Sequence, residues 1–484
     1  MILKNLDNIN LDNFPVAIFG SGPAGITTAL ELEKKRIKCL LIEAGNENYS
    51  KISQEFYKGK IIGDQITDLS SSRLRQFGGT SGHWGGWSKP MEKYNLELWP
   101  INENNLNPYL KRTCEILNIN NQFRKSSLNE FFNQIEFQYS KVKFADKFKN
   151  YIKNSNNILL ILNTQLSHFV GHNNNTKYAV CISNDTIKEL RTKYFILACG
   201  GIENSRLLLW TRDKNQKFIE NNLPIGKYWM HHPWILGGKG VISKKKLKEK
   251  LENNFLKQDK FLRFAAKREL INKKKILSAS IYMDAKEDTK IYKEVIKDIL
   301  CVAPEYGKKI ARMIFKKDLK CGNIFMQLEE NPTENNKIVL DKKKDKFGIP
   351  MTKLFYKKSK HTLKTAKLFM EEFGNLCRKN DLGRIAIKDS IYNLEEYEDL
   401  GAFHHLGGTR MGINKFESVV NKDLKVHGVN NLYVSGSSNF VTGGYTNPTF
   451  TIVQLAIRLA EEINKKLHHF ILITPNLLLN IISL

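Results

Sequence analysis

The segment that decides the fold is VAIFGSGPAGITTALELEKKRIKCLLIEAG, residues 16–45. Its first five residues form an apolar run that ends at Gly20, as a buried parallel strand does. Residues 26–35 then show helical periodicity, and residues 39–45 form a second apolar run that contains Glu43. The order strand, glycine-rich turn, helix and strand predicts a βαβ unit of an α/β domain.

The turn between the first strand and the helix has GxGxxG spacing, with Gly20, Gly22 and Gly25. In such a turn the first glycine permits a tight bend, the second lets backbone approach a pyrophosphate, and the third lets the helix pack on the strand. The helix start offers free N–H groups and partial positive charge to an anion. Glu43 stands where a carboxylate can accept hydrogen bonds from ribose hydroxyls. We therefore expect a dinucleotide site, with a tight packed turn as the alternative.

The composition is that of a folded globular protein with an unusual charge. Hydrophobic residues make up 41% and charged residues 26% of the 484 residues, which excludes disordered and collagen-like chains. Lys and Arg number 76 against 49 Asp and Glu, a net charge of +27 that would suit nucleic acid or an anionic membrane surface. Lysine runs such as 244–250 are not interleaved with aromatic residues, so we interpret the charge as a solvated surface and expect no nucleic-acid partner.

Cysteine usage and the two ends of the chain bear on location. The seven cysteines are odd in number and lack CxxC spacing, so we expect neither disulfides nor a metal site. The first 14 residues interrupt their apolar positions with Asn and Asp, unlike a secretory signal, and no apolar run approaches the roughly 20 residues of a membrane span. We expect a cytoplasmic protein. Residues 470–484 are apolar and contain Pro475, and we expect them to pack on the body, with weak membrane or partner contact as the alternative.

Two further segments fit a site built around the first turn. The loop RLRQFGGTSGHWGGWSKP, residues 73–90, can lay backbone N–H groups against a planar ring while Trp84 fills an apolar gap, although its composition fits a surface turn equally well. Residues 194–201, YFILACGG, run into a helical segment and predict another parallel strand. Residues 236–395 alternate basic helical stretches with β-prone runs, which predicts an inserted lobe with an antiparallel sheet that shapes the substrate pocket.

The C-terminal region holds the remaining polar motifs. AFHHLGGTRMG, residues 402–412, puts a histidine pair before a Gly-Gly-Thr turn. GGYTNPTFTIVQLAIRLAEEI, residues 443–463, leads from a loop into a long apolar helix with Pro448 in its first turn. A helix this apolar is expected to be buried, so its positive N-terminus points at something inside.

Taken together, the motifs resemble the glucose-methanol-choline (GMC) family of flavin oxidoreductases. The resemblance rests on GSGPAG with Glu43, then GGTSGHWGG, HLGGTRMG, SVVNKDLKVHGVNNLYV and NPTFT, in this order. Within the family the likeness is greatest to pyranose oxidase and bacterial sugar dehydrogenases. It implies a Rossmann-like FAD-binding domain with a parallel sheet, an α+β substrate-binding lobe with an antiparallel sheet, and hydride transfer from a CH–OH group of a sugar or other alcohol to flavin N5. Residues 236–395 show no such resemblance.

The resemblance also implies roles for individual residues. The catalytic base falls on His405 rather than His404, and Asn447 would hold the developing alkoxide. His83 matches the histidine that is bound covalently to the flavin in pyranose oxidase, so a covalent link there is one expectation. Gly436 stands where many family members carry Asp, and His231 and His232 stand in place of the family's DHP motif, where we expect a loop role. The residues expected to bind FAD are Gly20, Gly22, Gly25, Glu43, Gly79, Thr80, Ser81, His83, Trp84, Gly200, Gly436, Pro448 and Thr449.

The predicted organisation interleaves the FAD-binding domain with the other parts. Its segments are residues 1–105 and 161–235, joined by a connecting or lid segment at 106–160 and followed by the substrate-binding lobe at 236–395, an FAD-binding and catalytic part at 396–470 and the apolar tail at 471–484. Oxygen, a quinone and a protein are all open as electron acceptor. Two other functions also stay open: a redox-neutral or structural flavoprotein of this fold, and a basic protein that binds nucleic acid or an anionic polymer.

Overall fold

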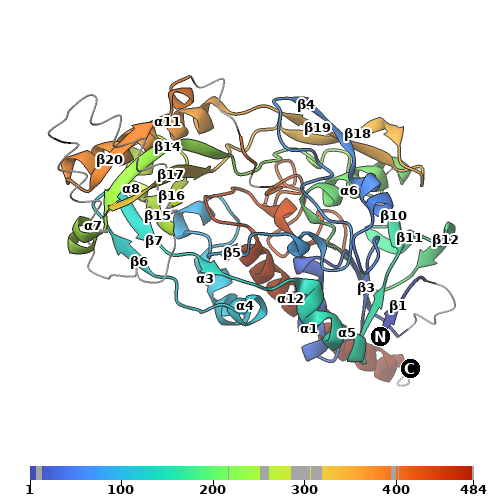
Figure 1. Ribbon diagram of the computed structural model, residues 1–484. Helices are drawn as coiled ribbons and strands as arrows, with labels where there is room; N and C mark the ends of the chain where they lie inside the picture. Colours follow the sequence, from blue (N-terminus) through green and yellow to red (C-terminus); the bar gives the residue numbers. More distant parts are fainter. Residues whose placement is uncertain are drawn as a thin grey trace.

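The computed structural model describes residues 1–6, 13–215, 217–250, 261–284, 306, 319–393, 399–401 and 403–481. Parts of the predicted lobe 236–395 and the last three residues of the predicted tail 471–484 therefore lie outside the described residues. A parallel sheet occupies one end of the molecule and a larger antiparallel sheet the other, as Figure 1 shows.

The parallel sheet forms around the predicted βαβ unit. Its six strands lie in the order β1 (Ile2–Leu3), β9 (Ile158–Ile161), β3 (Cys39–Ile42), β2 (Val16–Phe19), β13 (Tyr194–Leu197) and β21 (Leu432–Val434), and every neighbouring pair is parallel. All residues of β2 and β3 are buried, as their continuous apolar sequences predict. Helix α1 (Pro23–Lys34) connects these two strands and packs against α12 (Thr449–Ile481). The predicted Rossmann-like sheet is confirmed.

The antiparallel sheet lies at the other end of the molecule. Its seven strands lie in the order β20 (Gly383–Ile387), β14 (Trp234–Ser243), β17 (Leu319–Leu328), β16 (Ala279–Asp284), β15 (Phe261–Ala266), β7 (Phe132–Ile135) and β6 (Lys125–Ser127). Helix α11 (Lys360–Lys379) packs on it, and Phe132 and Phe264 meet Phe369 and Phe373 in this second core. The predicted antiparallel sheet with helices is confirmed.

The segment 106–160 contributes strands to both sheets. Its strands β6 and β7 extend the antiparallel sheet because β7 pairs with β15, while β9 lies inside the parallel sheet. The segment 106–160, predicted as a connection, is thus paired with the antiparallel sheet through β7 and with the parallel sheet through β9.

Smaller sheets and helices complete the fold. The small sheets comprise β10 (Thr164–His172), β11 (Asn175–Ser183) and β12 (Thr186–Leu190); β18 (Lys337–Lys344), β19 (Pro350–Tyr356) and β4 (Gly59–Gly63); and β5 (Trp87–Ser88) with β8 (Gln138–Tyr139). The remaining helices described are α2 (Lys51–Gln54), α3 (Glu103–Leu106), α4 (Leu110–Leu117), α5 (Phe144–Asn154), α6 (Gly200–Lys214), α7 (Lys244–Lys250) and α8 (Arg268–Lys274).

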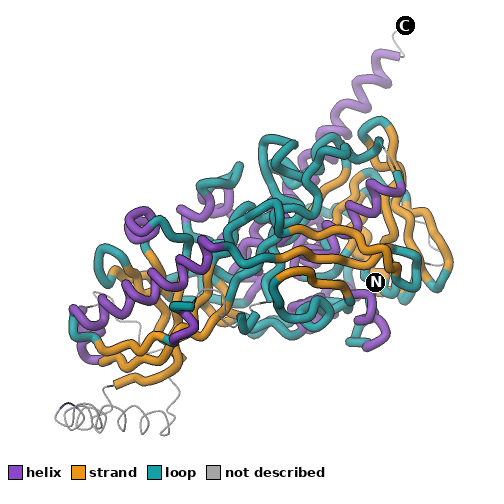
Figure 2. The backbone as a smooth tube through the Cα atoms, turned by 90° about the horizontal axis from the view of Figure 1, so that it is seen from above, coloured by secondary structure: helices purple, strands orange, loops and turns teal. Residues whose placement is uncertain are grey.

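The C-terminal helix is longer than the sequence indicates. Its first half is buried against the body, as predicted, but α12 continues through residue 475 to Ile481. A helix of 33 residues is about 50 Å long, so its end passes beyond the body, and Figure 2 shows it extending outward. The expectation that residues 470–484 pack on the body is wrong for the described part of that segment. Over the described residues, no helix combines the length and apolarity that a membrane span requires.

Candidate active site

Close backbone contacts build the glycine turn after β2. Gly20 has φ +101°, and a Cβ atom there would lie 2.4 Å from the Ala198 carbonyl oxygen. A Cβ atom at Gly25 would lie 1.9 Å from the Gly20 carbonyl oxygen, so α1 rests directly on the turn. At Gly22, in contrast, the nearest atom to such a Cβ is the Gly79 Cα at 4.0 Å. Two of the glycines are therefore required by packing, whereas Gly22 leaves open space beside the helix start.

Glu43 stands at the carboxyl end of β3, next to this turn. Its side chain is 6% exposed. One carboxylate oxygen accepts hydrogen bonds from the backbone N–H of Ser21 at 3.1 Å and from its hydroxyl at 2.6 Å, and the other accepts from the Gly45 N–H at 2.8 Å. These bonds hold the carboxylate at the rim of the open space.

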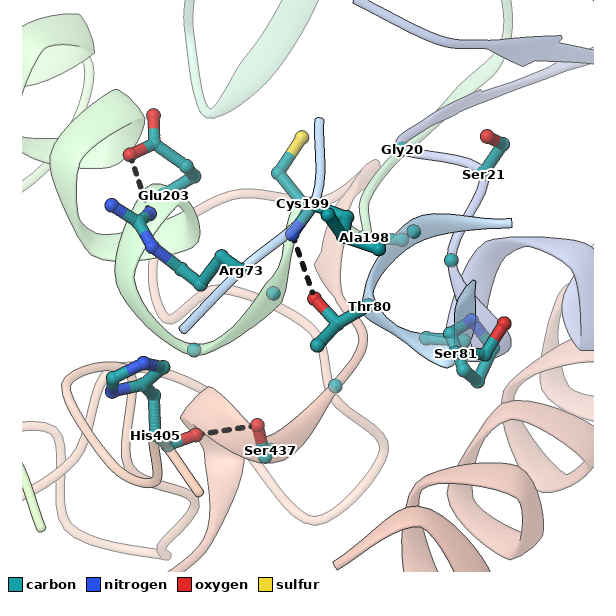
Figure 3. A pocket seen from close by; sticks show the side chains of 18 of the residues that line it. Gly20, Ser21, Arg73, Thr80, Ser81, Ala198, Cys199, Glu203, His405 and Ser437 are labelled. Carbon is teal, nitrogen blue, oxygen red and sulfur yellow. Dashed lines mark hydrogen bonds and ion pairs between the residues drawn. The ribbon is translucent and has the colours of Figure 1, made fainter. Parts of the chain in front are cut away.

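That space is a cavity of about 270 Å³ whose walls come from distant parts of the chain. Every predicted site residue except Gly25 lines it, and Gly25 lies behind the turn, under Gly20. The lining residues predicted from the sequence are Gly20, Gly22, Glu43, Gly79, Thr80, Ser81, His83, Trp84, Gly200, His405, Gly436, Asn447, Pro448 and Thr449. Figure 3 shows the β2 turn, the 73–90 loop and the C-terminal segment converging on this cavity.

The 73–90 loop forms one wall and is not a surface turn. The Trp84 indole N–H donates to the Val142 carbonyl at 2.8 Å, and the Ser81 hydroxyl accepts from the Phe144 N–H at 3.1 Å, so α5 anchors the loop. His83 is half-buried, and burial together with the charge of Lys143 lowers its pKa.

A buried ion network holds the start of this loop against α6. Glu203 on α6 pairs with Arg73 at 3.0 Å and with Arg206 at 2.9 Å, and Arg206 also pairs with Asp345 at 2.6 Å. Figure 3 shows Arg73 directed at Glu203. The network ties the start of the 73–90 loop to α6 and to the turn between β18 and β19.

Backbone conformation accounts for glycine at position 436. Gly436 has φ +132°, a conformation that an L-residue such as Asp rarely adopts. It follows β21 and precedes Ser437, whose hydroxyl donates to the His405 carbonyl at 2.6 Å (Figure 3). Glycine, and not the Asp of many GMC proteins, therefore fits this turn. The turn places Ser437 where its hydroxyl holds the His405 backbone.

The helix that follows Asn447 begins one residue later than expected. Pro448 precedes the first helical residue, Thr449, and its carbonyl accepts the Ile452 N–H at 2.9 Å. The helix start nevertheless lines the cavity, so its partial positive charge faces that space, as predicted.

His405 is held against the 66–73 segment. Its Nε2 lies 2.8 Å from the Ser72 hydroxyl, and its ring lies 5.9 Å from the Trp229 ring, centroid to centroid. Its Nδ1 is buried and has no hydrogen-bond partner among the described residues. Burial, the charge of Arg73 and His231 hold the pKa of His405 well below its usual value, so the imidazole is neutral near pH 7.

His404 and Asn447 are each bonded to a residue that sequence reasoning did not place in the site. His404 Nδ1 lies 2.9 Å from His232 Nδ1, and the Gln327 amide donates to Asn447 Oδ1 at 3.0 Å. His232 lies in the loop before β14, as expected for the HHP motif, and its side chain is fully buried. Gln327 lies on β17, in the region without resemblance, and the sequence offers no signal for it.

The sequence of this chain is similar to those of several known proteins. Residues 332–456 match the family model described as GMC oxidoreductase. The 2-methyl-1,2-propanediol dehydrogenase of Mycolicibacterium austroafricanum is 28% identical over 288 residues, 57% of this chain and 49% of the relative. The fructose dehydrogenase large subunit of Gluconobacter japonicus is 26% identical over 286 residues, 56% of this chain and 47% of the relative. The chain spans about half the length of these curated relatives that it matches.

Solved structures share the fold over nearly the whole chain. Pyridoxine 4-oxidase from Mesorbium loti superposes with a TM-score of 0.58 at 11% identity, over 93% of this chain and 99% of that one. Formate oxidase superposes with a TM-score of 0.55 at 15% identity, over 94% of this chain and 98% of that one. Residues 332–456 thus match the GMC oxidoreductase model, the two dehydrogenase relatives are similar to this chain over more than half of its length, and the solved oxidases share its fold.

Proposed function

We propose that this protein is an FAD-dependent oxidoreductase that oxidises a CH–OH group of a sugar or other alcohol. The observation that carries the proposal is a single cavity that joins the GxGxxG turn and Glu43 to His404, His405 and Asn447. The names of the two relatives, a diol dehydrogenase and a fructose dehydrogenase, support an alcohol or sugar as substrate.

The residues present fit FAD. The open space beside Gly22 at the start of α1 suits a pyrophosphate, and Glu43 at the end of β3 suits a ribose. The 73–90 loop and the start of α12 supply the walls for a planar ring. When bound, FAD supplies at flavin N5 an acceptor for the hydride that leaves the alcohol carbon.

His405 and Asn447 have different roles toward the substrate hydroxyl. Since His405 is neutral and lines the cavity, its imidazole can take the hydroxyl proton, and the hydrogen bond between Nε2 and Ser72 orients the ring. Because Asn447 Oδ1 already accepts from Gln327, the Asn447 N–H groups are left to donate to the substrate oxygen. Gln327 belongs to the lobe 236–395, which supports our proposal that this lobe forms the substrate side of the cavity.

The decisive experiment mixes the purified yellow protein anaerobically with a panel of sugars and alcohols and follows flavin absorbance. Bleaching by a sugar or alcohol supports the proposal, and repeating the reaction in air and with a dye acceptor distinguishes an oxidase from a dehydrogenase. If no alcohol bleaches the flavin, a redox-neutral or structural flavoprotein is favoured instead. A colourless protein that stays colourless after incubation with FAD would overturn the proposal altogether.

His83 is our candidate for a covalent link to the flavin because it lines the same cavity. Denaturing the yellow protein tests this directly, since covalent flavin precipitates with the polypeptide and free flavin remains in solution. Loss of the precipitated colour in His83→Ala would assign the bond to His83.

A further inference from the structure

The hydrogen bonds around His404 determine which of its nitrogens carries the proton. His232 Nε2 lies 3.1 Å from the Gly443 carbonyl oxygen, which can only accept, so this nitrogen carries hydrogen. Burial lowers the pKa of His232 to about 4, so the ring is neutral and its Nδ1 has a lone pair. His404 Nδ1, 2.9 Å away, must therefore donate to it.

This series of hydrogen bonds leaves Nε2 of His404 as a free acceptor. Burial and the neighbouring histidines hold the pKa of His404 well below its usual value, so a ring that carries hydrogen on Nδ1 has a lone pair on Nε2. The residue is partly exposed and lines the cavity. Its Nε2 makes no hydrogen bond to any residue that the structure describes.

One side chain links this acceptor to Asn447. The Gln327 amide nitrogen lies 3.0 Å from Asn447 Oδ1 and 3.5 Å from His232 Nδ1. Gln327 therefore bridges the residue that orients His404 and the residue that donates to the substrate oxygen.

We infer, on the basis of the proposed function, that His404 Nε2 accepts a hydrogen bond from a second hydroxyl of the substrate, and that the enzyme acts on polyhydroxylated substrates rather than monohydric alcohols. His405 takes the proton of the reacting hydroxyl, and Asn447 donates to its oxygen. His404 Nε2 therefore needs a different donor, which a second hydroxyl of the substrate can supply. A substrate that has a methyl group in place of the second hydroxyl leaves His404 Nε2 without a partner. We therefore expect kcat/KM to be about 10- to 100-fold lower for it than for the hydroxylated substrate. His232 and Gln327 act as positioning residues.

The test compares propane-1,2-diol with propan-1-ol as reductants of the flavin-loaded wild-type protein. We expect kcat/KM to favour the diol by about 10- to 100-fold. In His404→Phe, which keeps a ring but removes the acceptor, the diol should lose most of this advantage while propan-1-ol loses less. His361→Phe is the matched control, since His361 is an exposed histidine on α11 that bonds the Lys275 carbonyl, and it should keep the wild-type ratio.

The positioning role of His232 has its own readout. His232→Phe removes the acceptor for His404 Nδ1–H, so KM should rise for the diol and stay near its original value for propan-1-ol, whereas a general structural defect would affect both.

The outcomes separate the two proposals. Equal kcat/KM for diol and mono-alcohol in the wild-type protein overturns the role of His404 but leaves alcohol oxidation standing, and this comparison does not depend on any variant folding. An unchanged diol preference in a folded, yellow His404→Phe overturns it as well. Flavin that no sugar, diol or alcohol reduces overturns the proposed function and this inference together.

Discussion

Replacing Gly25 with Ala tests whether backbone packing at the glycine turn supports the whole cofactor region. The new Cβ would lie 1.9 Å from the Gly20 carbonyl oxygen, against roughly 3.4 Å for ordinary contact, so about 1.5 Å of movement is needed. The turn has little freedom to move, because the Gly20 N–H donates to the Ile42 carbonyl at 2.7 Å and the Ala198 carbonyl closes its other side.

The expected cost follows from these contacts. Overpacking that displaces backbone costs about 1–3 kcal/mol, and we expect about 3 kcal/mol because a carbonyl, not a flexible side chain, blocks the new atom. The higher helix propensity of Ala over Gly offsets only about 0.5–1 kcal/mol. Thermal unfolding should show a midpoint lower by several degrees, and the flavin absorbance per polypeptide should fall.

A second glycine provides the control. Gly374 lies inside α11, where a new Cβ would meet only the Ile385 Cβ, at 3.9 Å. Gly374→Ala should therefore keep its flavin and gain about 0.5–1 kcal/mol. A Gly25→Ala protein that unfolds at the wild-type temperature and carries full flavin would refute the packing argument.

Three further predictions concern buried charges and the base. His405→Ala should lower turnover about 10²-fold or more with FAD still bound, measured by anaerobic flavin reduction, and unchanged reduction would remove His405 from that role. Burial raises the pKa of Glu330 to about 7, so the folded protein keeps a proton that the unfolded chain loses above pH 4.5. Its free energy of unfolding should therefore fall by about 3 kcal/mol as pH rises from 4.5 past 7, and urea titrations of Glu330→Gln should lack this decline. Arg206→Met should destabilise by about 3–5 kcal/mol because it leaves Glu203 and Asp345 buried near each other, and adding Asp345→Asn should restore part of the loss; equal unfolding midpoints would contradict this.

Local pattern was sufficient for the elements next to the glycine turn. Residues 16–20 and 39–43 are continuous apolar runs separated by one helix, and such a unit can form few structures other than two parallel strands. The strand at 194–197 repeats the same order and lies beside β2, as expected. The antiparallel lobe was also predicted in kind, although strands β6 and β7 were not, since β7 joins the sheet through β15, which lies more than a hundred residues away.

Sequence-based prediction failed where a feature depends on residues that are far apart in the sequence and meet only in the folded protein. The C-terminal helix continues to Ile481 and extends outward from the body (Figure 2), although the sequence contains Pro475. Gln327 reaches Asn447 only because β17 crosses the lobe at the right register, and no motif marks it.

Sequence alone determined the glycine turn and the carboxylate at the end of the next strand, because each depends on spacing over a few residues, whereas His405 and Asn447 were predicted from the resemblance of short motifs. Tertiary structure decided how the two histidines differ. Ser72 holds one nitrogen of His405, whereas His232 and the Gly443 carbonyl set the proton position on His404. Which nitrogen of an imidazole is free depends on its hydrogen-bond partners, and here those partners come from segments far away in the chain.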